Sequence, residues 1–113
     1  MPNSESSGDV HGLLSDGPTQ GDKWRELIDA NHSRFVSEFL ALAPPHIESM
    51  RTYLAPDEIE FSSIAWRIHT NSMENGSIRK SIRYHYGDDS HLSVSQYAHY
   101  GQLTQALQLS SIM

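Results

Sequence analysis

The fold is decided by residues 61–86, which read FSSIAWRIHTNSMENGSIRKSIRYHY. Between Ile78 and Tyr86, every apolar residue stands at an even-numbered position. This period of two is typical of a strand with one buried face, and the Asn75-Gly76 pair just before it is a common hairpin turn. The pattern therefore predicts a strand that ends at Tyr86 and pairs with an earlier strand through this turn.

The preceding stretch, residues 57–70, fits two patterns. As a helix, it begins with a capping box formed by Asp57 and Glu60, and its apolar residues recur at helical spacing. Those residues are Phe61, Ile64, Ala65 and Ile68. As a strand, it has high β propensity and places Trp66 and Ile68 on one face. We prefer the strand, because the strand that follows needs a partner.

The length of the turn sets which side chains share a face of the predicted hairpin. A three-residue loop ending at Gly76 pairs Trp66 with Tyr84 on a single apolar face. A two-residue loop would instead split the apolar residues between both faces, so the longer loop is expected. The outer face of this hairpin, named the basic face, then carries Arg67, His69, Arg79, Arg83 and His85.

Two helices are predicted before the hairpin. Apolar residues recur at helical spacing from Trp24 to Leu42, and the Pro44-Pro45 pair ends this helix because neither ring supplies an N–H. Pro45 is suited to the first position of a second helix, which continues to Leu54. The short link between them favours an antiparallel helical pair.

A further helix is predicted after the hairpin. Ser93 and Gln96 have the capping-box spacing, and apolar residues continue at helical spacing to about Leu109. Gly101 interrupts this helix at a cost of roughly 1 kcal/mol relative to Ala. This glycine therefore either permits close packing or marks a bend.

These elements follow one another in the order α-α-β-β-α, which predicts a small two-layer α+β domain over residues 22–113. The helical hairpin and the C-terminal helix are expected to pack on the apolar face of the β-hairpin. Residues 1–21 are rich in Ser, Gly and Asp and contain few apolar residues, so we expect a disordered tail. A short docking motif at residues 10–14 is the alternative for that tail.

Composition excludes several classes of protein. The 113 residues include no cysteine, which rules out disulfide scaffolds, zinc fingers and cysteine nucleophiles. Acidic residues number 14 against 8 Lys and Arg, and the net charge of −6 argues against nucleic-acid binding by the whole surface. The chain has neither the run of roughly 18 apolar residues that a membrane span needs nor a secretory signal at its start. We expect a cytoplasmic protein with no membrane contact.

The basic face is the candidate binding site. Arg67 and Arg83 would lie directly opposite each other across the hairpin, and like charges in that position repel. An anionic partner lying between the two guanidinium groups would relieve this repulsion, because the planar fork of Arg binds carboxylate or phosphate. The alternative is a solvated face whose arginines pair with carboxylates of the same chain.

A cluster of titratable residues follows the predicted hairpin. His85, Asp88 and His91 are ligand types for a divalent metal, but their spacing matches no metal signature. The same residues, with Tyr84 as a proton donor, supply the parts of an acid-base site. They are therefore weak candidates for catalysis and for metal binding, and we expect no cofactor.

The sequence thus predicts a small acidic protein-binding module that is not an enzyme, such as an inhibitor, an immunity protein, an adaptor or a regulatory subunit. The alternative is a small enzyme or ligand carrier with a pocket near residues 84–91. A protein partner is expected, and the apolar C-terminal segment offers a homodimer surface. This segment includes Leu103, Leu107, Leu109, Ile112 and Met113.

Overall fold

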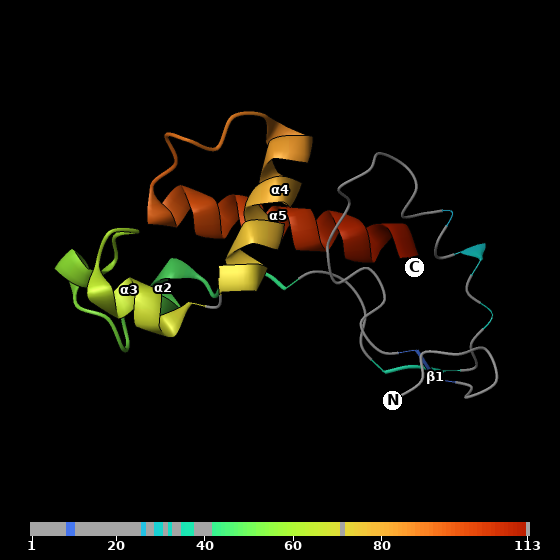
Figure 1. Cartoon of the computed structure of the whole chain (residues 1–113), viewed down its shortest axis with the longest axis horizontal. Coiled ribbons are helices and arrows are strands. Elements are labelled where there is room, and N and C mark those ends of the chain that lie inside the picture. The colour runs from blue at the N-terminus through green and yellow to red at the C-terminus, as the bar shows by residue number, and fades with distance from the viewer. Residues whose placement is uncertain are drawn as a thin grey trace.

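The computed structural model describes residues 9–10, 26, 29–30, 32, 35–37, 42–70 and 72–112. Its elements are β1 (Asp9–Val10), β2 (Phe35–Val36), α2 (Ile47–Met50), the 3₁₀ helix η1 (Pro56–Glu58), α3 (Ile64–His69), α4 (Ser72–Tyr86) and α5 (Val94–Ile112). Figure 1 shows α5 as the long axis, with α4 crossing it and with α2 and α3 lying beside one end of it. The described part of the chain is therefore built mainly from helices around α5.

The predicted β-hairpin is wrong, because residues 64–69 and 72–86 form the helices α3 and α4. Asn75-Gly76 lies inside α4 and makes no turn. Over residues 76–86, where the burial of α4 is described, the buried residues are Ile78, Ser81 and Ile82, and the last two follow Ile78 by three and four positions, as on one face of a helix. The even-numbered pattern was misleading, because a spacing of four fits a helix as well as a strand.

A serine cap explains why α3 is a helix. The hydroxyl oxygen of Ser63 accepts a hydrogen bond from the backbone N–H of Trp66 at 2.9 Å, which satisfies a free donor of the first turn. Trp66 points into the core and is 5% exposed. Ile64 and Ile68, which the hairpin placed on its buried face, are 68% and 74% exposed on the opposite side of the helix.

The N-terminal predictions are only partly covered by the described residues. The helix predicted from Trp24 to Leu42 is contradicted at β2, where Phe35 and Val36 pair in parallel with Asp9 and Val10 of β1. The rest of that helix lies mostly outside the described residues. The same is true of the predicted tail over residues 1–21, of which only Asp9–Val10 is described.

The helix expected before Pro56 and the helix expected after Gly87 are both present. The second predicted helix corresponds to α2, which is shorter than expected and is capped by His46, whose Nδ1 accepts from the N–H of Glu48 at 3.2 Å. The final helix, α5, is confirmed with its capping box. Ser93 and Gln96 exchange two hydrogen bonds, of 2.9 and 3.2 Å.

The core lies where α2, α3 and α4 meet α5. Its buried apolar residues are Met50, Leu54, Trp66, Ile78, Ile82, Val94, Tyr97 and Ala98. Trp66, Tyr97 and the half-buried Phe61 form an edge-to-face cluster with ring centroids 5.3 to 6.1 Å apart. The guanidinium of Arg79 lies 4.5 Å from the centre of the Phe61 ring, so α4 covers this cluster with a cation–π contact.

Gly101 is a close-packing position, which decides between the two roles expected for it. A Cβ atom on this residue would lie 2.7 Å from Cδ of Pro44 and 3.2 Å from Cγ2 of Ile78. The amide of Gln102 also donates to the carbonyl oxygen of Pro44 at 3.2 Å. The segment before α2 is thereby held directly against α5 at the place where α4 crosses it.

Within the part of the chain that the structure describes, no helix is both long enough and apolar enough to cross a membrane.

Candidate functional site

A pocket of about 170 Å³ opens between the segment before α2, α3 and the core. It is named the apolar pocket and is lined by Leu42, Ala43, Pro44, Pro45, Met50, Tyr53, Leu54, Trp66, His69, Thr70, Ile78 and Tyr97. These residues come from five separate stretches of the chain, which the packing of α2, α3 and α4 on α5 brings together. A pocket of this kind, apolar with a few polar groups, is the default binding site of a small domain.

The floor of the apolar pocket is the protein core itself. Met50 is 1% exposed, Trp66 5% and Tyr97 2%, so the floor is rigid and largely aromatic. The rim, in contrast, is accessible, because Leu42 is 51% exposed and Tyr53 48%. A ligand that enters this pocket therefore meets an apolar surface whose shape is fixed by core packing.

Polar groups stand at one side of the rim. The rings of Tyr53 and His69 are in contact, with centroids 5.3 Å apart and planes tilted by 50°. Thr70 lies next to His69 and also lines the pocket. These side chains supply hydrogen-bond donors and acceptors at the mouth, while the floor is formed mainly by the side chains of Met50, Trp66 and Tyr97.

The stretch that supplies Met50, Tyr53 and Leu54 is acidic. Residues 42–63 contain four carboxylates, and Arg51 is their only basic counterpart apart from histidine. The carboxylates are Glu48, Asp57, Glu58 and Glu60. Arg51 already pairs with Glu48. This stretch of the chain therefore carries net negative charge and attracts positively charged groups.

The residues of the predicted basic face do not share one face. Arg67 and His69 lie on α3, whereas Arg79, Arg83 and His85 lie on α4. Because both segments are helices, the expected cross-strand pairing of Arg67 with Arg83 does not exist. His69 alone among these five lines the apolar pocket.

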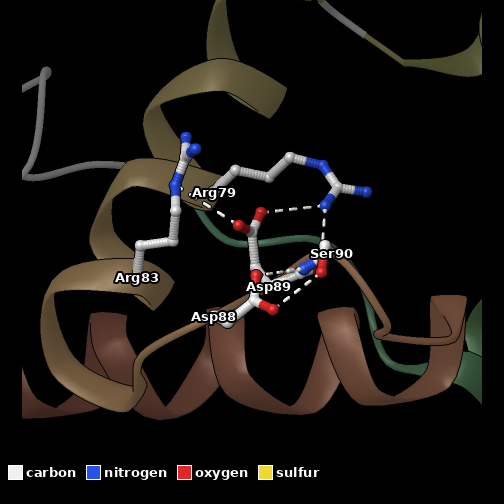
Figure 2. Close-up of polar contacts among 5 residues, drawn as sticks. All are labelled: Arg79, Arg83, Asp88, Asp89 and Ser90. Carbon is white, nitrogen blue, oxygen red and sulfur yellow. Dashed lines mark hydrogen bonds and ion pairs between the residues drawn. The ribbon is translucent and has the colours of Figure 1, made fainter.

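Figure 2 shows Arg79 and Arg83 converging on Asp89. Arg79 Nη1 lies 2.9 Å from Asp89 Oδ2, and Arg83 Nε lies 3.3 Å from Asp89 Oδ1. The Asp89 side chain is 8% exposed, so the two guanidinium groups neutralise a carboxylate that is nearly buried. These two arginines thus follow the alternative stated above, in which a carboxylate of the same chain is their partner.

In the titratable cluster, Asp88 is held by hydrogen bonds within its own loop. Asp88 accepts two hydrogen bonds from Ser90, at 3.0 Å from its backbone N–H and 2.8 Å from its hydroxyl. These bonds hold the pKa of the Asp88 carboxyl below its ordinary value. Among the described residues, no group of three or more His, Asp and Glu side chains is placed to hold a metal ion. Tyr84, His85, Asp88 and His91 also do not line the apolar pocket.

His85 gives the protein a predictable response to acid. Burial lowers the pKa of its imidazole, and its Nε2 has no hydrogen-bond partner. The unfolded chain, with an ordinary histidine pKa of about 6.5, therefore takes up a proton before the folded chain does. We expect the free energy of unfolding, measured in urea, to fall as the pH is lowered below about 6.5.

The variant His85→Phe keeps a ring in the same place and should reduce this fall between pH 7.5 and 5.5. His91→Phe, at an exposed position, is the matched control and should retain the wild-type response. Equal pH sensitivity in wild type and His85→Phe would show that the burial of His85 does not govern the acid response.

Sequence reasoning missed most residues of the apolar pocket. Leu42 was assigned to the end of a predicted helix and Tyr53 and Thr70 stand in no recognisable motif, and the three meet only because α2 and α3 pack against α5. One signal was available, because Pro44-Pro45 followed by an apolar helix predicts a rigid extended segment next to that helix. That segment forms one wall of the pocket.

Comparisons of the chain with protein-family models, with curated proteins and with solved structures found no match.

Proposed function

We propose that this chain is a non-enzymatic protein-binding module whose docking site is the apolar pocket. The observation that carries the proposal is the open mouth between Leu42 and Tyr53 above a buried aromatic floor. Binding energy at protein interfaces concentrates in such pockets, where one large side chain of the partner becomes fully buried. The module would act by occluding or bridging the protein that it binds.

The size of the apolar pocket suits a single side chain. An apolar cavity of about 150 Å³ is large enough for benzene, so a pocket of this volume takes a single aromatic or branched aliphatic side chain. The polar groups of Tyr53, His69 and Thr70 at the mouth can bond to the backbone of the segment that carries the anchor. The expected anchor is therefore Trp, Phe or Leu in a partner protein.

The charge of residues 42–63 determines which residues we expect beside that anchor in the partner protein. Residues 42–63 supply most of the pocket's lining residues and carry four carboxylates against one arginine, so Lys or Arg beside the anchor would be attracted to this stretch. Acidic segments of a partner would be repelled. The proposed ligand is thus a protein segment with one large apolar residue flanked by basic residues.

Short synthetic peptides test this proposal. A peptide with a central Trp between lysines is expected to bind and to shift the NMR signals of the Trp66 indole and the Met50 methyl group. Replacing the central Trp of the peptide with Ala should weaken binding about 30-fold, which corresponds to roughly 2 kcal/mol for one anchor side chain. Replacing its lysines with glutamates should weaken binding further at low salt.

Two variants of the protein complete the experiment. Ala43→Phe places a ring in the mouth of the apolar pocket and is expected to abolish peptide binding. Ala106→Phe adds the same ring at an exposed position on α5 and should leave binding unchanged. The proposal is wrong if no anchor peptide binds, or if indole alone binds with the same affinity as the peptides, because the pocket would then be a small-ligand site.

A further inference from the structure

A second hollow, named the polar slot, lies where α4 packs on α5. It is lined by residues of these two helices, among them Ile78, Ser81, Gly101, Thr104 and Gln108, and by Leu42. Ser81 is 1% exposed and Gln108 3%, so both polar side chains occupy core positions. Buried polar side chains normally find hydrogen-bond partners within the protein.

The side-chain amide of Gln108 has no such partner. Within the described part of the chain, neither Nε2 nor Oε1 of Gln108 makes a hydrogen bond, and the hydroxyl of Ser81 is also unpaired. Thr104 in the same slot shows the usual arrangement, because its hydroxyl donates to the carbonyl oxygen of Tyr100 at 2.9 Å. The slot therefore contains an amide and a hydroxyl that can each donate and accept a further hydrogen bond.

The polar slot is too narrow to admit a water molecule between its lining residues. Burial of these polar atoms without partners costs free energy of folding, because the unfolded chain bonds them to water. A ligand group that bonds to Gln108 need not displace water from it. Its hydrogen bonds therefore add to the free energy of binding with little loss on the protein side.

Access to the polar slot depends on Leu42. This residue lines the slot from outside α4 and α5, and it is 51% exposed. Turning its side chain outward would open the slot at a small cost in buried apolar surface. Leu42 and Ile78 line the apolar pocket as well, so the two sites are adjacent and one bound segment can reach both.

The unpaired atoms of Gln108 select the chemistry of the ligand. A carboxylate would leave Oε1 without a donor, and an ammonium group would leave Nε2 without an acceptor. A primary carboxamide pairs with both atoms through two hydrogen bonds. We propose that the polar slot binds the carboxamide of an Asn or Gln side chain. Resting on the proposed function, this residue belongs to the same partner segment whose anchor fills the apolar pocket.

Acetamide tests the polar slot without any anchor. Its addition is expected to cause saturable shifts in the NMR signals of the Gln108 side-chain amide and the Gly101 backbone N–H. Acetate, which has no donor, should cause no such shift. In Gln108→Met, whose side chain is also unbranched, the Gly101 signal should no longer respond to acetamide. Absence of a response in the wild type, or an equal response to acetate, overturns the proposal.

The stability of Gln108→Met provides a second test. Because the atoms that it removes make no hydrogen bond, the urea midpoint should stay unchanged or rise. A clear fall in the midpoint would show that the fold itself depends on the Gln108 amide, and it would contradict a role in ligand binding.

Anchor peptides test whether both sites bind one segment. Asn is placed in turn at each position near the central Trp, with Leu at the same position as the matched control. At one position, Asn should bind wild type about 10-fold more tightly than Leu, and Gln108→Met should abolish this preference.

The outcomes separate this inference from the proposed function. Anchor peptides that bind with no preference for Asn overturn the shared segment and leave the apolar pocket as a docking site. A response to acetamide without binding of any anchor peptide supports the carboxamide site and overturns the proposed function.

Discussion

Replacing Asp89 with alanine is expected to lower the free energy of unfolding by about 3 kcal/mol. The carboxylate is 8% exposed and bonds to both Arg79 and Arg83, so its removal leaves two cations on α4 without their partner. Arg79 also donates to the backbone oxygen of Asp89 and covers the Phe61 ring. The substitution should therefore loosen the aromatic cluster as well as the loop between α4 and α5.

Urea unfolding followed by circular dichroism measures this effect, and the neighbouring residue provides the control. Asp88 bears the same charge, but it is exposed and bonds only to Ser90. Asp88→Ala should thus destabilise the protein far less than Asp89→Ala. Equal losses from the two variants would mean that the contribution of Asp89 comes from the loop and not from its arginine partners.

The variant Gly101→Val is expected to destabilise the protein by about 3 kcal/mol. Its Cβ would lie 2.7 Å from the Pro44 ring, which cannot rotate away, and its methyl groups would meet Ile78. The helix propensity gained on leaving glycine recovers only about 0.5 kcal/mol. The substitution should push the Pro44 segment away from α5 and open the apolar pocket along that wall.

A second glycine provides the matched comparison for Gly101→Val. Gly76 also lies in a helix, α4, but a Cβ atom there would have no neighbour within 4 Å. Gly76→Val should change the free energy of unfolding by no more than about 0.5 kcal/mol. Thermal unfolding of both variants distinguishes the packing at Gly101 from the general effect of replacing glycine in a helix.

The sequence was most informative where local hydrogen bonding decides the structure. The capping box of Ser93 and Gln96 predicted the start of α5 correctly, because the two residues satisfy each other's backbone donors within one turn. The hairpin prediction failed because packing between segments, and not local hydrogen bonding, decides the structure there. Ile78 and Ile82 have a spacing that suits a strand and a helix, and only packing against α5 decides between them.

The candidate sites also differ in how far they depend on packing between distant segments. Pairing of Arg79 and Arg83 with a carboxylate of the same chain was one of two outcomes stated from the sequence, and the structure identifies that carboxylate as Asp89. The apolar pocket was not predictable. Its lining residues, such as Pro44 and Tyr97, are distant in sequence, and single-sequence patterns contain no information on which helices meet.

The contact between Pro44 and α5 also bears on the order in which the chain folds. α4 and α5 are joined by a short loop, so their packing forms between residues close in sequence and should be fast. The bond from Gln102 to Pro44 joins residues 58 positions apart and must close a much longer loop. We therefore expect docking of residues 42–54 to be the later event, and in hydrogen exchange these residues should open before α4 and α5 separate. The docking of residues 42–54 builds one wall of the apolar pocket. A partner that fills this pocket would therefore bind only chains in which that docking is complete.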